Sequence, residues 1–455
     1  MVQAVRGFIG LGLMLGVGAL PAAAQGLALP AADPVGIARS GAQVAYGYSL
    51  EAAATNPAIL ASLKEAWGFY LAVGLEMSET QQTLESNQKT YNSFDRNRTI
   101  GGFGLSNRIS SGMTLGLKLD EPFQRHARLL DDAPSRFLGD GIDLSARRLE
   151  AQAAWTLSPN LSVGVGLGVA RLAFDSSTVM RLGLPVDPTQ VSSTGNPVDG
   201  LVDHRVGQSG NKVVPSYSLG LRWALSPRWT MGFAHQSGLK GDLDLKASLR
   251  DNNLGLYAND GLSTPSLGTD VRATSLVARS SALPGSGTME LPSRTTFGMR
   301  HRATPMVTWE ADLRWVSGSL QIPSNASIQT PSGVVVAPTT PPKGVGHFGL
   351  GGSIEVELGK FWTLRAGLSL DQRSTPESLT EPQLGGTPSA AFSIGAGYKV
   401  MGGELSFGYQ FRQAQDQDSR NLSGGWSSAG YRNVGTRVRE EGMGHLMAFG
   451  FKKMF

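Results

Sequence analysis

Histidine, serine, glycine and carboxylate side chains are the groups in this sequence whose spacing could support catalysis or cofactor binding. Six histidines are scattered along the chain, and none is spaced as a metal-binding pair or an HExxH-type site. They are His126, His204, His235, His301, His347 and His445. No local arrangement brings a serine together with a histidine and an acid, and the chain has no cysteine. We therefore expect neither an enzyme nor a bound metal or other cofactor.

Two short patterns imitate known binding motifs. The glycines of GVGLG, residues 164–168, superficially resemble a dinucleotide-binding loop. They share one face of a predicted strand, however, and no helix follows them, so the required context is missing. The glycines are better explained by close packing, because a strand face without side chains lets another part of the protein lie against it. Asp242, Asp244 and the Asp-Gly pair at 260–261 could contact a cation, but a solvated loop explains them better.

The composition and the N-terminal sequence limit the class to which the protein can belong. Charged residues make up 17% of the 455 residues and 59 are glycine, which is unusual for a soluble enzyme of this size. The net charge is +4 and no run of five or six Lys or Arg occurs, so nucleic acid is not an expected partner. Arg6, the apolar run 7–20 and the small residues 22–24 predict a signal peptide over 1–24. A retained membrane anchor is less favoured because its apolar core would be short.

Short segments with period-2 hydrophobicity fill most of the remaining chain. In 161–170, for example, Leu and Val alternate with Ser, Gly and Ala. This period predicts strands with one apolar face. Related segments lie at 67–77, 113–120, 161–170, 217–225, 229–233, 307–315, 362–370 and 405–411.

The apolar face of these strands is expected to point outward. Tryptophans cluster at strand ends, as the interfacial girdles of a membrane barrel require. The other face carries Gly, Ser, Thr and paired charges, among them Glu310, Asp312 and Arg314, which suit a polar lumen. The segments also fit the roughly 9–11 residues that a strand needs to cross a bilayer.

The connections alternate between short and long, which gives the strand number. Short turns lie near 107–111, 158–160, 226–228, 303–305, 358–360 and 400–403. Long loops run roughly over 78–95, 121–144, 175–213, 240–290, 317–344, 372–388 and 414–443. Bacterial outer-membrane barrels have an even number of strands with short periplasmic turns and long extracellular loops. The sequence therefore predicts an all-β, 14-stranded antiparallel transmembrane barrel over 65–455, in the outer membrane of a Gram-negative bacterium.

The predicted barrel implies several contacts besides its own wall. Outer-membrane lipid surrounds it, and the terminal aromatic Phe455 is of the kind that the barrel assembly machinery recognises. Residues 25–64 are not strand-like but carry Ala, Leu, Val and Tyr, so we expect them to fold into the lumen as a hatch. A disordered tail is the alternative. The loops at 175–213 and 240–290 carry apolar residues that either pack on themselves or form an exposed capture site.

Several stretches resemble one family, the FadL-type long-chain fatty-acid transporters of the bacterial outer membrane. They are Gln25-Gly26-Leu27, Gly36-Ile37-Ala38-Arg39, Asn56-Pro57-Ala58-Ile59-Leu60, YSLGLRWALSPR at 217–228 and the segment from Leu291-Pro292 to Trp315. The order and spacing are similar over essentially the whole mature chain, and the Asn56-Pro57-Ala58 segment is the most specific part. The sequence departs at Leu27, where relatives often carry Phe.

The resemblance implies passive transport of hydrophobic molecules. Substrate would be caught at the long loops and passed to a luminal pocket beside the N-terminus, with Leu27 and Leu29 as apolar contacts. A shift of the hatch would then release it sideways at a kink in the third strand. Asn56-Pro57-Ala58 would pack at that kink, beside 112–120, where Gly112 and Gly116 permit distortion.

A fatty-acid carboxylate would need a cation in the lumen. The four arginines whose facing suits this role are Arg294, Arg300, Arg314 and Arg365. A structural charge network explains them as well, and both interpretations stay open. Long-chain fatty acids are the first expected substrate. The alternatives are an aromatic hydrocarbon channel, a general porin, or a structural or adhesive barrel without transport.

Overall fold

The computed structural model describes most of the chain after residue 30. The described residues are 31–47, 49–84, 90–94, 98–128, 141–183, 201–250, 281–318, 321, 327–330, 333–336, 346–372, 388–414, 417–419 and 438–455. Three short helices, α2 (Pro34–Ala38), η1 (Glu51–Ala54) and η2 (Pro57–Ser62), precede the strands. None of the helices in these ranges has the length and hydropathy to cross a membrane.

Strands account for almost all of the rest. Their bounds are β1 (Trp67–Leu84), β2 (Thr90–Phe94), β3 (Arg98–Ser110), β4 (Met113–Arg128), β5 (Gly141–Ser158), β6 (Leu161–Gly183), β7 (Leu201–Ala224), β8 (Trp229–Gln236), β9 (Leu239–Arg250), β10 (Ser281–Leu291), β11 (Ser293–Arg302), β12 (Val307–Ser317), β13 (Ser327–Thr330), β14 (Gly333–Val336), β15 (His347–Leu358), β16 (Trp362–Asp371), β17 (Ser389–Val400), β18 (Gly403–Ala414), β19 (Gln417–Ser419) and β20 (Val438–Met454).

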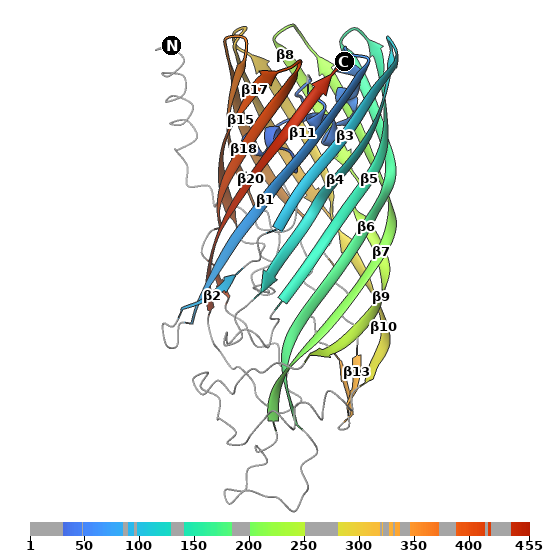
Figure 1. The fold of residues 1–455 in the computed structure, drawn as a ribbon, viewed down its shortest axis with the longest axis vertical. Coiled ribbons are helices and arrows are strands. Elements are labelled where there is room, and N and C mark those ends of the chain that lie inside the picture. Colours follow the sequence, from blue (N-terminus) through green and yellow to red (C-terminus); the bar gives the residue numbers. More distant parts are fainter. Residues whose placement is uncertain are drawn as a thin grey trace, which may run out of the picture.

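The strands close into one antiparallel barrel of 14 wall strands, as predicted. β1 pairs with β3 on one side and with β20 on the other, so the last strand meets the first (Figure 1). Two wall strands are each interrupted once: β8 and β9 are separated by Ser237-Gly238, and β10 and β11 by Pro292. Proline lacks the N–H that a ladder needs, which accounts for the second interruption.

The apolar face of the wall points outward, which confirms the prediction. Large apolar side chains on alternate positions are exposed, for example Leu167 at 69% and Phe449 at 59%. The intervening side chains are buried in the lumen and many are polar, including Glu310 and Arg365. At the short-turn end, the rings of Trp229 and His301 are tilted against each other with their centroids 4.1 Å apart, in the region where an interfacial aromatic girdle is expected.

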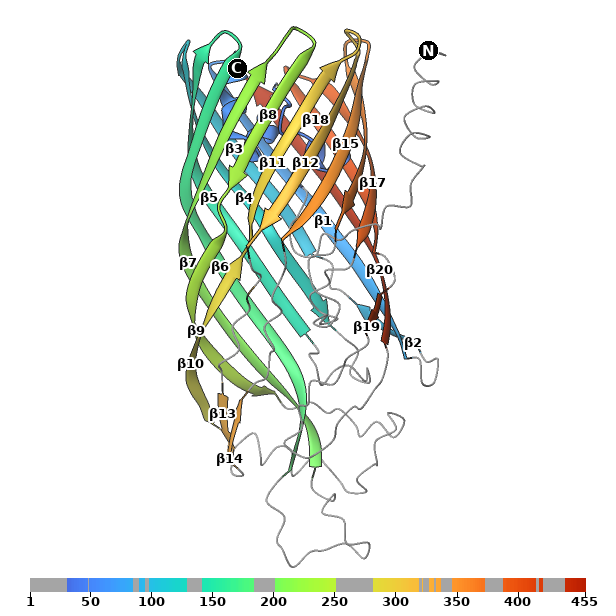
Figure 2. The same cartoon turned by 180° about the vertical axis from the view of Figure 1, so that it is seen from behind.

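The wall is taller than the sequence predicts at one side. β6 continues to Gly183 and β9 and β10 pair beyond the expected loop boundary, so the loop limits 175–213 and 240–290 are wrong (Figure 2). The limits 78–95, 121–144 and 414–443 are also wrong, because strands extend into these ranges as well. In this region the alternation persists with the faces exchanged. Leu243 and Leu245 point inward, and Asp242, which accepts a hydrogen bond from Thr288, lies on the outer face of β9.

Residues 31–64 lie within the barrel, in the half that carries the short turns (Figure 1). We call them the luminal segment. Nearly all of their side chains are buried, and α2 packs on β17 and β18 whereas η2 packs on β5, β6 and β7. The signal peptide expected at 1–24 and the first hatch residues, 25–30, lie outside the described residues.

Candidate functional site

Two capped turns shape the luminal segment. Asp33 caps α2, its Oδ1 accepting from the Gly36 N–H at 2.7 Å, and Pro34 follows at the first helical position. Asn56 caps η2 in the same way, accepting from the Ala58 N–H at 3.1 Å, with Pro57 next. The two Asx-Pro sequences therefore start helical turns, because proline has no N–H to leave unsatisfied there.

The amide of Asn56 also joins the luminal segment to the wall. Its Nδ2 donates to the Val44 carbonyl at 2.7 Å and to the Leu221 carbonyl of β7 at 3.1 Å. Asn56 thus satisfies one backbone group of the segment and one of the barrel. This hydrogen bond to the wall is made with β7, whereas the family resemblance places Asn56-Pro57-Ala58 beside the third wall strand.

Glycines of the wall make room for Asn56-Pro57-Ala58. A Cβ on Gly164 would lie 2.5 Å from the Pro57 carbonyl carbon, and one on Gly220 would meet the side chain of Asn56. A Cβ on Gly116 would lie 2.7 Å from the side chain of Leu60, two residues beyond Ala58. A Cβ on Gly112 would meet no atom within 4 Å, so Gly112 does not make room for the luminal segment as Gly164 and Gly220 do.

A buried ion pair anchors the luminal segment to the opposite wall. Arg39 donates to Glu310 at 2.7 Å and lies 3.6 Å from Glu355, and all three side chains are buried. The Tyr46 hydroxyl donates to Glu355 at 2.8 Å. Burial and the Glu355 charge raise the pKa of Tyr46 to about 12, so its hydroxyl keeps the proton that it donates.

Asp312 receives the backbone that follows this anchor. Its Oδ2 accepts from the N–H groups of Gln43 and Val44 at 2.9 and 3.1 Å. One carboxylate group thus accepts two consecutive N–H groups, which holds the turn between Arg39 and Tyr46 against β12.

Two of the predicted luminal arginines belong to the charge network of the wall. Arg365 donates to Glu355 at 2.8 Å and to Glu404 at 2.7 Å. Arg314 pairs with Asp371 at 3.2 Å. The geometry therefore favours the structural interpretation for both. Arg300 contacts the segment directly, its guanidinium lying 5.3 Å from the centre of the Tyr46 ring.

The third wall strand, β4, is irregular. It pairs with β3 only as far as Phe103 opposite Leu119, and its register with β5 shifts between Asp120 and Phe123. Pro122 lies in this bulge, where it removes a donor from the ladder. The first residues of β3, 98–102, therefore have no ladder partner on β4.

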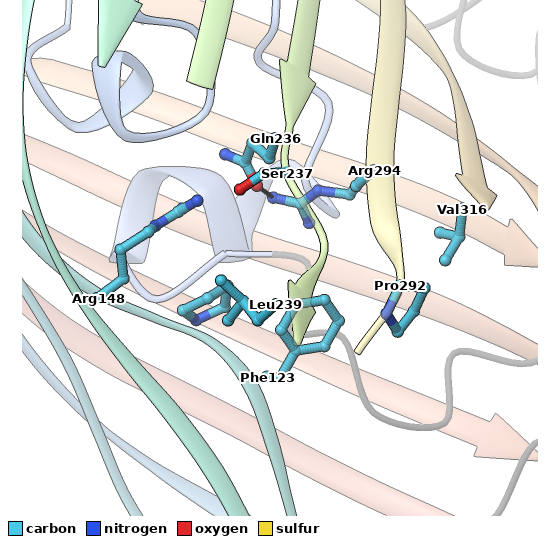
Figure 3. Close-up of a pocket in the computed structure, with 9 residues that line it drawn as sticks. Phe123, Arg148, Gln236, Ser237, Leu239, Pro292, Arg294 and Val316 are labelled. Carbon is cyan, nitrogen blue, oxygen red and sulfur yellow. Dashed lines mark hydrogen bonds between the residues drawn. The ribbon is translucent and has the colours of Figure 1, made fainter. Parts of the chain in front are cut away.

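Two adjoining pockets lie at the level of this bulge. One is lined by Asp33, Gln43 and Thr55 of the luminal segment together with Glu121, Pro122 and Arg294 of the wall. The second extends from Pro122 and Arg294 toward Phe123, Leu239 and Val316 (Figure 3). Their free volumes are about 30 and 10 Å³, which suffices for water molecules only.

Beyond the pockets, the lumen wall turns apolar toward the long loops. A cluster of buried side chains, here called the apolar wall, spans β4 to β7, β9 and β10. Its members are Phe123, Ala127, Ile142, Leu144, Ala146, Ala170, Leu172, Phe174, Val206, Val214, Leu239, Leu243, Leu245, Ala247, Met289 and Leu291. The polar lumen around the luminal segment and the apolar wall thus meet at the pockets.

Arg294 lies at this boundary and lines both pockets. It donates to the neutral amide of Gln236 at 2.9 Å. Arg148 lies on the other side of the second pocket (Figure 3). It makes a bidentate pair with Asp120 at 2.9 and 2.6 Å. The Arg294 guanidinium therefore lies where the apolar wall meets the polar lumen. An amphipathic ligand with its tail on the apolar wall would place its head group beside this cation.

Several site residues were missed from the sequence. Pro122 carried a readable signal, since proline within a strand pattern indicates a bulge. Arg148 and Asp120 gave none, because only the register between β4 and β5 makes them partners. Leu27 and Leu29, the expected apolar contacts of the hatch, lie outside the described residues.

Asp33 makes docking of the luminal segment sensitive to pH. Burial and the neighbouring Glu51 charge raise its pKa from 3.8 to about 6, against weaker opposition from the Gly36 N–H, Gln43 and Lys452. Asp33 thus binds its carboxyl proton more tightly when the luminal segment is docked than when the segment is released. Docking should be strongest below about pH 4 and should lose roughly 3 kcal/mol as the pH rises through about 6.

Asp33→Asn should remove this dependence, because the amide oxygen can still cap α2 but carries no charge. Hydrogen exchange of residues 34–38, corrected for intrinsic rates, should report easier opening at about pH 7.5 than at about pH 4.5 in the wild type only. Identical pH profiles for the two proteins would exclude Asp33 as the titrating group.

Comparison with known proteins identifies similar sequences and folds. A family model described as outer membrane protein transport protein (OMPP1/FadL/TodX) matches residues 14–455. No curated protein sequence matches the chain at a significant level.

The fold has close counterparts among solved structures. A FadL homologue from Pseudomonas aeruginosa is similar with a TM-score of 0.74 at 16% identity, covering 95% of this chain and all of that one. The toluene transporter TbuX of Ralstonia pickettii has a TM-score of 0.59 at 16% identity, over 93% of this chain and 98% of its own. The P. putida toluene transporter TodX scores 0.62 at 13% identity, with the same coverage. These identities establish the fold alone.

Proposed function

The chain belongs to the outer membrane protein transport protein family (OMPP1/FadL/TodX), and from this we propose that it carries long-chain fatty acids passively through its barrel. It is an outer-membrane β-barrel of a family that transports hydrophobic compounds. The proposal adds the substrate, the luminal binding site, the hatch role of the luminal segment and the lateral exit. No catalytic step is involved.

The observation that carries the fatty-acid substrate is the position of Arg294 at the end of the apolar wall. An acyl chain gains about 0.8 kcal/mol for each CH₂ that leaves water, so the apolar wall favours the tail. A carboxylate beside a guanidinium gains charge-assisted hydrogen bonds, so Arg294 favours the head. A monoaromatic hydrocarbon would use the first interaction but has no group for the second.

The small pockets argue that the lumen is closed at rest. Binding sites for molecules of this size usually measure about 300–1,000 Å³, whereas the two pockets have free volumes near 30 and 10 Å³. The luminal segment occupies the lumen at the short-turn end, which argues against an open general porin. We infer that the segment shifts when substrate binds.

The bulge in β4 supports a sideways exit. Where β3 and β4 lose their ladder, the wall lacks the backbone hydrogen bonds that close it elsewhere. Pro122 and Arg294 both line the two pockets, so the bulge borders the space beside Arg294. Capture at the long loops remains part of the proposal, and those loops fall largely on residues that the structure does not describe.

The test compares two substrates in cells that lack their own outer-membrane fatty-acid transporter. Arg294→Met should lower uptake of labelled oleate by roughly 10- to 100-fold, because hydrogen bonds to a charged group are worth about 1.5–3 kcal/mol. Uptake of labelled toluene through the same variant should change less than about twofold, since toluene has no charged head.

Arg302→Met is the matched control, because Arg302 is exposed at the short-turn end. Within the described residues its guanidinium donates only to the nearby Pro305 carbonyl. Surface expression is equalised for all three proteins. If Arg294→Met lowered both substrates equally, Arg294 would not bind the carboxylate. Toluene uptake without oleate uptake by the wild type would favour the aromatic-hydrocarbon channel, and a large stable conductance would favour a porin.

A further inference from the structure

The outer face of β5 and β6 changes from apolar to basic at one level. Toward the short turns, the outward positions hold Leu149 on β5 and Leu167 and Val169 on β6, exposed by 46, 69 and 48%. The next outward positions toward the long loops hold Arg147 and Arg171. The apolar belt therefore ends here, at the height where lipid headgroups begin.

Arg147 and Arg171 are direct cross-strand neighbours. Their Cα atoms are paired in the β5–β6 register, and the adjacent pair, Arg148 and Ala170, is buried in the lumen. The two guanidinium groups consequently share the lipid-facing side. Two like charges placed directly opposite each other are destabilising in a sheet unless an anion lies between them.

The carboxylates nearby do not neutralise this pair. Arg147 lies 3.5 Å from Glu121, but Glu121 lies at the same distance from Arg98. Asp143 is shared between Arg98 at 2.9 Å and His126 at 3.4 Å. Arg171 is exposed and has no ion pair or hydrogen bond with any residue in the described ranges.

We propose that Arg147 and Arg171 together bind a phosphate group of an outer-leaflet lipid. Guanidinium groups bind phosphate through paired N–H donors, and two of them can hold one phosphate from both sides. The acyl chains of that lipid would lie on Leu149, Leu167 and Val169, directly below. Both parts of a phosphorylated lipid thus have a partner on this face.

The site lies at the edge of the β4 bulge, because Glu121 belongs to the bulge and contacts Arg147. A lipid held there occupies the membrane directly outside the irregular part of the wall. The site itself does not depend on which molecule the barrel carries.

The experiment measures lipid bound to the purified protein by native mass spectrometry. The probes are bisphosphorylated lipid A, the same lipid without phosphates, and inorganic phosphate. Binding of the phosphorylated lipid by the wild type should exceed that of the double variant Arg147→Gln/Arg171→Gln by at least about tenfold. The phosphate-free lipid should bind both proteins equally weakly.

Two further proteins keep the result interpretable. Arg171→Gln alone leaves the contact between Arg147 and Glu121 intact and should lose most of the difference. Arg108→Gln/Arg228→Gln removes two arginines from the short-turn end and should bind like the wild type. Equal binding of the phosphorylated lipid by all variants would overturn the proposal. So would the finding that inorganic phosphate competes for the site as effectively as the phosphorylated lipid does.

Discussion

A double variant carrying Ala42→Cys and Gly351→Cys is expected to lose nearly all uptake when oxidised and to regain it on reduction. Ala42 lies in the luminal segment and Gly351 on β15, and a Cβ placed on Gly351 would be 3.5 Å from the Cβ of Ala42. Disulfides span Cβ separations of about 3.5–4.5 Å, so this pair has suitable geometry. If the segment must shift for substrate to pass, tethering it should lower uptake at least about tenfold.

The chain suits this experiment because it contains no cysteine that could compete. The periplasm is oxidising, so the bond can form in the cell. Leu313→Cys/Leu350→Cys is the matched control, because these two residues are paired on neighbouring wall strands and both face outward. Its oxidation should leave uptake unchanged. Full uptake by the oxidised Ala42/Gly351 variant would show that this part of the segment stays docked during transport.

Arg39→Met should release the luminal segment from the wall. The change leaves Glu310 and Glu355 buried without the cation that now lies 2.7 and 3.6 Å away. Removing one partner of a buried pair costs about 3–5 kcal/mol, which corresponds to a shift of the docking equilibrium by roughly 10²–10⁴-fold. The barrel wall keeps its ladders, so the protein should still assemble.

Hydrogen exchange over residues 34–47 and single-channel conductance measure this release. Both should rise in Arg39→Met and stay at the wild-type level in Lys64→Met, since Lys64 is exposed at the end of the segment. Adding Glu310→Gln to Arg39→Met should recover part of the loss, because one uncompensated charge disappears. Unchanged exchange in Arg39→Met would mean that the backbone bonds to Asp312 suffice to hold the segment.

Much of the fold could be predicted from residues that are near neighbours in the sequence. Period-2 hydrophobicity in segments such as 161–170 reports which face of a strand meets lipid, and the alternation of short and long connections gives the strand number. The taller part of the wall was missed although it has the same period. In β9, Leu243 and Leu245 alternate with Asp244 and Lys246, but there the apolar side faces inward because the strand has left the membrane.

The site residues divide in the same way. Asn56 and Pro57 could be recognised because a cap followed by proline is a local pattern. The sequence predicts Arg294, Arg314 and Arg365 together as inward-facing arginines, and nothing in it separates the three. Arg314 and Arg365 pair with carboxylates on other strands, and only the folded structure shows these ion pairs.

The sequence by itself therefore determined the class of protein, the strand number and the lipid-facing residues, because these depend on local periodicity. Only the tertiary structure decided which inward side chains meet. Arg39 and Glu310 are 271 residues apart, and Asn56 bonds a carbonyl 165 residues away. Such pairs depend on strand register around a closed barrel and on the path of a segment inside it. Both follow from the packing of the whole wall, to which each local pattern contributes only one strand.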